Sequence, residues 1–275
     1  MRRVIHERTR SRAAAGAGVT LAVVVTLSAL VGVPSVANAA LGQCGAFGAR
    51  FDGFYSPGLH DQIGVEGVSA NIRVEDGAVC GSDASVNNLT ATWVMIYPTV
   101  GGGLAQVGFW RTGTWSGFTP QYFYEYGATD SGVGQGWHTG VADGTTHRFW
   151  VQWVTNGCPG GLPACFAFNI DNVRIHTSDF NPYQYWGNPD NANTMWIMAL
   201  MGEAHYAESD IMGSNTGGVA TVWDSAQAQD WATNNYRGFP CDLLARDDNA
   251  ARWGLNYPTN KGCGAWSTYT IAGTG

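Results

Sequence analysis

The sequence predicts an all-β protein, an antiparallel β-sandwich stapled by disulfides and containing at most one short helix. Short runs of Val, Ile, Phe, Tyr and Trp recur at intervals of roughly ten to fifteen residues, bounded by Gly, Pro, Asn and Asp, which is typical of sandwiches and barrels. Several runs alternate apolar with polar or small residues, the period of a half-buried strand. An even number of cysteines, 6 in all, favours a disulfide framework.

The first 40 residues have the pattern of a secretory signal peptide. The Arg-rich start MRRVIHERTRSR precedes the apolar run AGVTLAVVVTLSALVGV and the small-residue sequence ANAA, which match the n-region, h-region and cleavage site of exported proteins. We expect residues 1–40 to be removed, residues 41–63 to form an irregular N-terminal arm, and residues 64–275 to form a single β-sandwich domain. A retained membrane anchor is the alternative, but the small residues favour cleavage near Ala39 or Ala40.

The exported chain is acidic. Loss of five arginines and one glutamate with the signal peptide changes 14 basic and 21 acidic residues to 9 and 20, a formal charge of −11. Such a chain repels nucleic acid, and no other stretch approaches the ~20 apolar residues that span a bilayer. We therefore expect a secreted, extracellular protein with no nucleic-acid partner and no membrane contact after signal cleavage.

All the cysteines follow the signal peptide, so they reach an oxidising compartment and we expect three disulfides. Spacing alone does not determine the connectivity. The pairs that we favour are Cys158 with Cys165 around the Pro159, Gly160, Gly161 turn, Cys241 with Cys263, and Cys44 with Cys80. No CxxC or paired Cys/His spacing indicates zinc, and we expect no metal and no cofactor.

The first half of the domain contains successive strand patterns. The clearest is VEGVSANIRVED, in which Val68, Ala70 and Ile72 alternate with polar or small residues, as in a half-buried strand. The predicted strand segments, in order, are 65–76, 88–98, 104–113, 120–130, 147–155 and 165–176.

The second half adds fewer and longer elements. The run around Glu203, within residues 194–214, predicts the next long strand, and GVATVWDSA (218–226) predicts the one after it. Residues 225–234 are the single helix candidate, with Ser225 as a possible N-cap, and an irregular surface loop is the alternative. After Cys241 we expect loops until a final strand at WSTYTIAG.

Two side chains stand out chemically. Glu203 follows Gly202 at the end of a long apolar run, and a carboxyl group in such surroundings suits general acid–base catalysis. Gln106 lies among apolar neighbours such as Leu104 and Val107, where a primary amide needs hydrogen-bond partners and can donate to an oxyanion. We hypothesise that they meet on one face of the sandwich. The alternatives are a solvent-facing Glu203 at a strand end and an outward-facing Gln106.

The order of several short motifs resembles the glutamic peptidase superfamily, meaning the fungal eqolisins and the neprosin-type enzymes. The strand AQVGFW resembles the eqolisin strand that carries a catalytic glutamine, at the position of Gln106. GEAHYAESDIMGS resembles the neprosin segment in which a catalytic glutamate follows glycine and precedes Met, Gly and Ser, at the position of Glu203. Further matching motifs are WVMI, PQYFYEYG and CPGGLPACFAF, so the resemblance covers roughly residues 64–220.

This resemblance implies a secreted, acid-acting endopeptidase with a polypeptide substrate. Glu203 would act as general base on the attacking water and then as general acid to the leaving amine, while Gln106 would stabilise the oxyanion. This chemistry requires no metal or cofactor. The residues that the resemblance places along the substrate cleft are Glu125, Trp110, Tyr124 and Trp93.

A non-catalytic carbohydrate-binding or surface β-sandwich protein is the alternative function. Flat indole rings stack on sugars, and two carboxylates such as Glu125 and Glu203 would suit a glycosidase. The tryptophans available for stacking are Trp110, Trp115, Trp137, Trp150, Trp153, Trp186 and Trp196.

Other catalytic centres have little support in the sequence. His205, Glu208 and Asp210 could bind a metal ion, but the HExxH spacing is absent and a solvated strand edge explains them better. No GxSxG elbow is present, which argues against an α/β-type serine hydrolase.

Overall fold

The structure is a computed structural model, and the residues it describes belong to one compact unit. They are residues 50–55, 64–74, 89–112, 120–129, 133–140, 144–189, 191, 193–205, 213–214, 219–230, 234–238, 244–248, 253–256 and 266–270. The predicted signal peptide and Cys44, Cys80, Cys241 and Cys263 lie outside this set. In the described part of the chain, no helix has the length and apolar character needed to cross a membrane.

Sheet A contains the predicted strands 88–98, 104–113 and 120–130 together with the strand of Glu203. Its seven described strands follow the order β14, β1, β10, β3, β4, β5, β6, and every neighbouring pair is antiparallel. The strands are β14 (Leu244–Asp247), β1 (Arg50–Tyr55), β10 (Trp196–Ala204), β3 (Leu89–Pro98), β4 (Leu104–Thr112), β5 (Gln121–Gly127) and β6 (Val133–Gly140).

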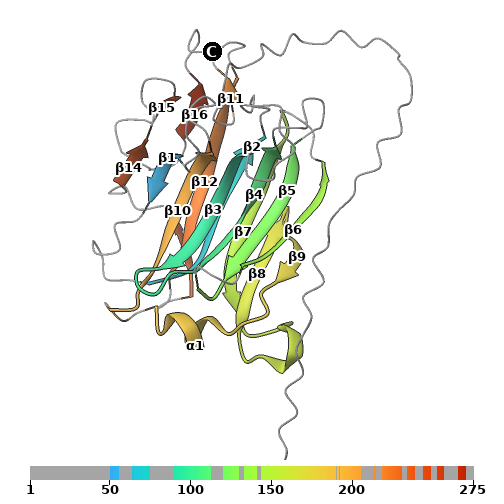
Figure 1. The fold of residues 1–275 in the computed structure, drawn as a ribbon, viewed down its shortest axis with the longest axis vertical. Coiled ribbons are helices and arrows are strands. Elements are labelled where there is room, and N and C mark those ends of the chain that lie inside the picture. The colour runs from blue at the N-terminus through green and yellow to red at the C-terminus, as the bar shows by residue number, and fades with distance from the viewer. Residues whose placement is uncertain are drawn as a thin grey trace, which may run out of the picture. The chain divides into compact units, whose positions relative to one another are not determined.

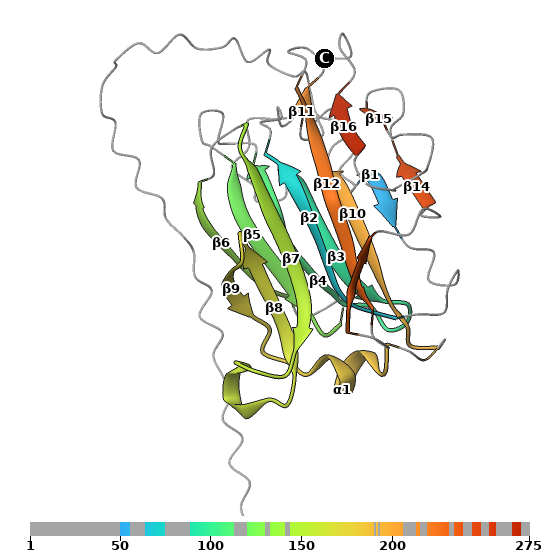
Figure 2. The ribbon, with the colours of Figure 1, turned by 180° about the vertical axis from the view of Figure 1, so that it is seen from behind.

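Sheet B packs against sheet A and faces the viewer in Figure 2. Its described strands follow the order β15, β16, β11, β12, β2, β7, β8, β9, with β13 paired to β12. They are β15 (Trp253–Asn256), β16 (Trp266–Thr270), β11 (Gly213–Ser214), β12 (Val219–Asp230), β2 (Val65–Arg73), β7 (Thr146–Val154), β8 (Cys165–Ile170), β9 (Val173–Thr177) and β13 (Tyr236–Gly238). The predicted antiparallel β-sandwich is therefore confirmed.

The two sheets form two layers (Figure 1), and the main hydrophobic core lies between them. Val94, Phe109 and Leu200 of sheet A are fully buried, as are Phe149 and Trp223 of sheet B. The rings of Phe109 and Phe149 lie 6.0 Å apart between centroids. Because side chains alternate along a strand, the residues between these core positions in sheet A project from its outer face.

The predicted helix at residues 225–234 is wrong in its described part, because residues 219–230 form β12. Ala226 and Ala228 are buried in the core, so the alternation is that of a strand paired with β2. Ser225 is not an N-cap: it has a φ of 51° inside a β-bulge between Asp224 and Gln227. Pairing in the sheet outweighs the moderate helix propensity of this segment.

The short helix lies elsewhere, in α1 (Pro182–Trp186). The Asn181 side chain accepts a hydrogen bond of 3.2 Å from the Tyr183 backbone N–H, and proline occupies the first turn. Asparagine at the N-cap followed by proline is a favourable helix start. One short helix among the described residues agrees with the predicted fold class.

Several short strands were not predicted. Residues 50–55 of the expected irregular arm form β1, residues 133–140 form β6, and the segment after Cys241 contains β14 and β15. The predicted strand 165–176 divides into β8 and β9, because Asp171 and Asn172 have φ values of 50° and 67°. Both residue types tolerate the left-handed region that a tight hairpin turn requires.

The Cys158–Cys165 disulfide is confirmed, with the two Cα atoms 5.7 Å apart. It closes the turn that contains the 3-10 helix Pro159–Gly161. Gly160 and Gly161 have φ values of 61° and 75°, conformations that glycine adopts without steric cost. The other two predicted pairings involve cysteines outside the described residues and stay predictions.

A buried pair of carboxyl groups makes the fold sensitive to pH. Glu66 on β2 and Asp230 on β12 are 2% and 7% exposed. Desolvation, and then the charge of Asp230, raise the pKa of Glu66 to about 7. The folded chain therefore binds this proton more tightly than the unfolded chain, so its stabilising contribution is complete below about pH 4.5 and is lost as the pH rises through about 7.

We expect Glu66→Gln to reduce the loss of stability between pH 4 and pH 7.5 by on the order of 2 kcal/mol, because glutamine does not ionise. Urea denaturation of both proteins at the two pH values measures this difference. Tyr183 and Tyr236 also face Glu66, but their own pKa values are raised far above this range. An identical pH dependence in the two proteins would show that Glu66 is not responsible.

Candidate active site

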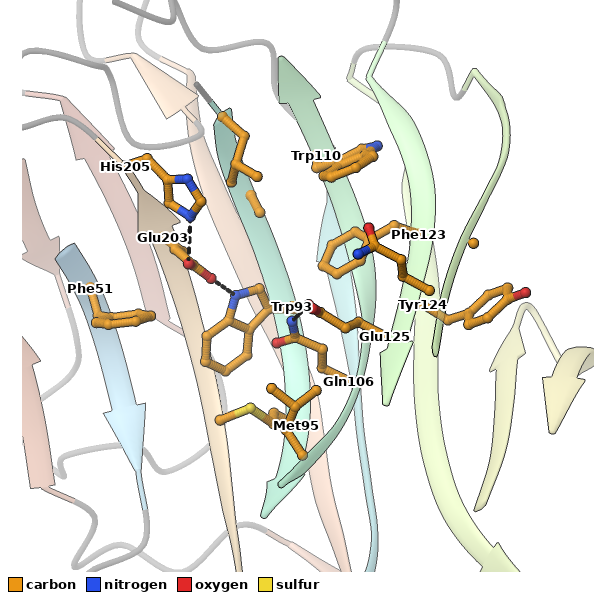
Figure 3. Close-up of a pocket in the computed structure, with 15 residues that line it drawn as sticks. Phe51, Trp93, Met95, Gln106, Trp110, Phe123, Tyr124, Glu125, Glu203 and His205 are labelled. Atoms are coloured by element: carbon orange, nitrogen blue, oxygen red, sulfur yellow. Dashed lines mark hydrogen bonds and ion pairs between the residues drawn. The ribbon is translucent and has the colours of Figure 1, made fainter. Parts of the chain in front are cut away.

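A cavity of about 420 Å³ opens on the outer face of sheet A. Strand alternation brings Trp93 of β3, Gln106 of β4, Glu125 of β5 and Glu203 of β10 to this face (Figure 3). The four side chains come from four consecutive strands of the sheet, in the order β10, β3, β4, β5. The cavity therefore gathers two carboxyl groups, an amide and an indole from segments far apart in the sequence.

Glu203 is held by two side chains. Its Oε2 accepts a hydrogen bond of 2.9 Å from the indole Nε1–H of Trp93, and its Oε1 lies 3.1 Å from Nε2 of His205. The Glu203 side chain is 16% exposed, so solvent reaches it from the cavity. His205 is anchored in turn, because its backbone N–H donates to the Leu89 carbonyl at 3.0 Å. This arrangement fixes both carboxylate oxygens.

Gln106 is oriented by a carboxyl group. It lies directly across from Met95 on β3 and Glu125 on β5. Its Nε2–H donates to Glu125 Oε2 at 2.5 Å, and the residue is 5% exposed. A primary amide nitrogen carries two N–H groups. One N–H of Gln106 binds Glu125, and this contact fixes the direction in which the second N–H points.

The Glu125 carboxyl group has a raised pKa. Burial is the main cause of the higher pKa, and the negative charge of Glu203 raises the pKa further. The hydrogen bond from Gln106 and the interaction with His205 both lower the pKa, but by less than burial raises it. Glu125 therefore keeps its proton to a higher pH than an exposed glutamic acid. In acid it is neutral, which removes one negative charge from beside Glu203.

Gln106 and Glu203 share one cavity without contacting each other. On β3, the central strand between them, Gln106 pairs with Met95 and Glu203 pairs with Ala91. These two backbone positions of β3 are about 13 Å apart along the strand at ~3.3 Å per residue. The Trp93 indole lies between the amide and the carboxylate (Figure 3). The two groups thus flank an indole, and a bound substrate would have to lie across it to contact both.

The remaining predicted cleft residues take different places. Trp93 and Trp110 line the cavity, and the Trp110 ring stacks on Phe123 with centroids 5.6 Å apart. Tyr124 borders the cavity, but its ring points away from Gln106 (Figure 3) and stacks on His176 between the sheets at 4.1 Å. Tyr124 therefore contributes mainly to the core.

Sequence reasoning considered His205 only as a possible metal ligand and did not identify Phe51 and Phe123 as site residues. His205 stands two residues after Glu203, and residues two apart in an extended segment share one face. This spacing could have identified His205 as a neighbour of Glu203. As a metal ligand it has no support in the described residues, where no group of three His, Cys, Asp or Glu side chains could hold an ion. Glu208 and Asp210 lie outside those residues.

The fold and the site define a two-sheet antiparallel sandwich with a carboxylate- and amide-bearing cleft on the outer face of one sheet. It is similar in structure to scytalido-glutamic peptidase crystallised with a peptide-based transition state analog, with a TM-score of 0.47 and 12% identity. A second structure of scytalido-glutamic peptidase, with a transition state analog inhibitor, gives a TM-score of 0.45 and 13% identity. Each comparison covers 82% of this chain and 100% of the other chain. No family model and no curated protein sequence matches the chain.

Proposed function

We propose that the protein is an exported, acid-acting endopeptidase that cleaves polypeptides with Glu203 and Gln106. The observation that carries the proposal is that one open cavity holds a carboxylate fixed at both oxygens and an amide fixed at its nitrogen. A positioned carboxylate supplies general acid–base catalysis, and a positioned N–H supplies oxyanion stabilisation. The motif order in the sequence points to the same pair.

In the proposed reaction, Glu203 in its ionised form takes a proton from a water molecule as that water attacks the scissile carbonyl carbon. The second N–H of Gln106 donates to the carbonyl oxygen as it becomes an oxyanion. Glu203 then gives the proton to the leaving amine nitrogen as the C–N bond breaks. Trp93 and His205 keep the carboxylate in place throughout these steps.

The charge of the cavity favours work in acid. Glu125 stays protonated to a higher pH than an ordinary glutamic acid because it is buried. As the pH rises, its ionisation adds a negative charge near Glu203 and changes the group that orients Gln106. Proteolysis should therefore decline as the pH increases towards neutral, and Glu66 makes the fold less stable in the same direction.

A glycan-directed function is the second candidate, and the aromatic lining of the cavity favours it. Trp93, Trp110, Phe51 and Phe123 line the same cavity as two glutamates, and aromatic rings with paired carboxylates also suit sugar binding and glycoside hydrolysis. The two functions differ in the bond that is broken, so a substrate panel separates them.

We expect the purified exported chain to cleave a denatured protein between pH 2 and pH 5 and to release no reducing sugar from a panel of polysaccharides. New peptide N-termini and reducing ends are measured in parallel from pH 2 to pH 7, with circular dichroism at each pH to show that the chain is folded. Reducing ends without new N-termini would establish the glycan-directed function instead. A folded chain that cleaves neither polymer would overturn both catalytic proposals.

A further inference from the structure

A second cavity of about 440 Å³ lies on the same outer face of sheet A. It shares Phe51, Trp93 and Met95 with the first cavity. Trp93 is the residue whose indole N–H holds Glu203. The two cavities are thus adjoining parts of one cleft, and each is within the ~300–1,000 Å³ of typical ligand sites.

Aromatic and aliphatic side chains line most of this second cavity. Ala199 and Met201 of β10 are 1% and 4% exposed and lie beside Tyr55 and Tyr97. Burial is the main reason that the pKa of Tyr97 rises to about 12, so this phenol is packed against the cavity wall. A cavity lined mainly by aromatic and aliphatic side chains gains free energy by enclosing an apolar group.

Arg246 is the one charged residue that lines the second cavity in the described part of the chain. Its guanidinium lies over the Phe51 ring, 4.4 Å from the centroid, and its Nη2 lies 2.8 Å from Asp248 Oδ2. The cation is therefore already paired with a carboxylate and an aromatic face. It closes the edge of the cavity without attracting an acidic group strongly, and it disfavours a second cation.

We infer that this cavity is a specificity subsite that binds a large apolar side chain, aromatic or branched aliphatic, of a polypeptide substrate. The inference rests on the proposed function, because the substrate's scissile bond lies in the adjoining cavity. The shared wall of Trp93 and Met95 places such a side chain next to the carboxylate of Glu203. Small side chains leave the cavity unfilled, and basic side chains meet Arg246.

The expected result is a preference at one position within three residues of the scissile bond. Peptides matched except for Phe, Ala or Lys at that position should be cleaved with a kcat/KM at least about 10-fold higher for Phe, since filling an apolar pocket discriminates by this amount or more. Mass spectrometry of a digested denatured protein first locates the position. Equal enrichment of all side chains at every position overturns the subsite.

Two variants of different kinds test the assignment to this cavity. Ala199→Leu fills the cavity from the floor and should reduce the Phe-to-Ala ratio to within about 3-fold. Arg246→Gln changes a half-exposed side chain at the edge of the cavity and leaves the buried floor intact. It should raise the ratio of kcat/KM for the Lys peptide to that for the Phe peptide at least about 3-fold, because it removes like-charge repulsion. Val173→Leu, at an exposed position on β9 of sheet B, adds a methylene elsewhere and should keep the wild-type ratios. Unchanged ratios in folded Arg246→Gln and Ala199→Leu proteins overturn the assignment.

Binding measurements separate this inference from the catalytic proposal. Calorimetry with the Glu203→Gln protein and uncleaved peptide amides should give at least about 10-fold tighter binding of the Phe peptide than of the Ala peptide, a difference lost when Ala199→Leu is added. Cleavage by the wild type without side-chain preference overturns the subsite and leaves the peptidase. Selective binding without any cleavage supports the cavity as a peptide-binding site and overturns the peptidase.

Discussion

Replacing Glu203 with glutamine should lower kcat/KM for peptide hydrolysis by about 10²- to 10⁴-fold, the range that a positioned general acid–base group contributes. Glutamine has the same shape and keeps an oxygen that accepts from Trp93 Nε1–H, but it cannot take a proton from water at working pH. Steady-state kinetics with a fluorogenic peptide at the acid optimum measures the effect. The loss should lie mainly in kcat, because the substitution removes a group needed in the transition state.

The matched control for this variant is Asp179→Asn, which neutralises an exposed carboxylate in the segment before α1. It should retain activity within about 3-fold, as surface substitutions away from a site usually have small effects. Circular dichroism and urea denaturation show whether Glu203→Gln is folded. A folded Glu203→Gln protein with wild-type kcat/KM would remove Glu203 from the mechanism.

Replacing Gln106 with methionine should lower kcat by about 10²- to 10³-fold, the cost of losing one oxyanion donor. Methionine matches the length of glutamine, so it fills the 5% exposed site without an N–H group. KM should change little, since the donated hydrogen bond strengthens only when charge develops on the carbonyl oxygen. The same fluorogenic assay measures both constants.

Gln184→Met is the control, because Gln184 is an exposed amide on α1 that lines neither cavity. Its activity should stay within about 3-fold of wild type. The Gln106 variant also removes the donor to Glu125, which further favours the protonated form of that carboxyl group. A kcat equal to that of the control would show that Gln106 donates nothing to the transition state.

The sequence predicts those parts of the fold in which local pattern and tertiary pairing agree. Strands such as β2 and β4 carry their own alternation, so their existence follows from the chain alone. Pairing partners distant in sequence are needed for β1, which lies between β10 and β14, and for the Gly-rich β6. The error at Ser225 has the same cause, because a bulge against β2 interrupts an alternation that is otherwise that of a strand.

The site was predictable in its residue types and less so in its contacts. Alternation along β4 and β10 is enough to bring Gln106 and Glu203 to one outer face. The register across β3 decides how far apart they lie, and no local pattern encodes that register. For the same reason the contact between Trp93 and Glu203, 110 residues apart in the chain, had no sequence signal. The inward orientation of Tyr124 did have one, because Tyr124 is adjacent to Glu125 on β5 and successive side chains of a strand point to opposite faces.

The position of a bound tetrahedral inhibitor decides most directly whether Glu203 and Gln106 act on one peptide bond. A crystal structure with a phosphinic peptide at acid pH supplies this position. We expect one phosphinyl oxygen within about 3 Å of Gln106 Nε2 and the other within about 3 Å of a Glu203 carboxylate oxygen, both ordinary hydrogen-bond distances. A tetrahedral centre that contacts only one of the two residues, or that binds outside the cavity over Trp93, would contradict the proposed mechanism.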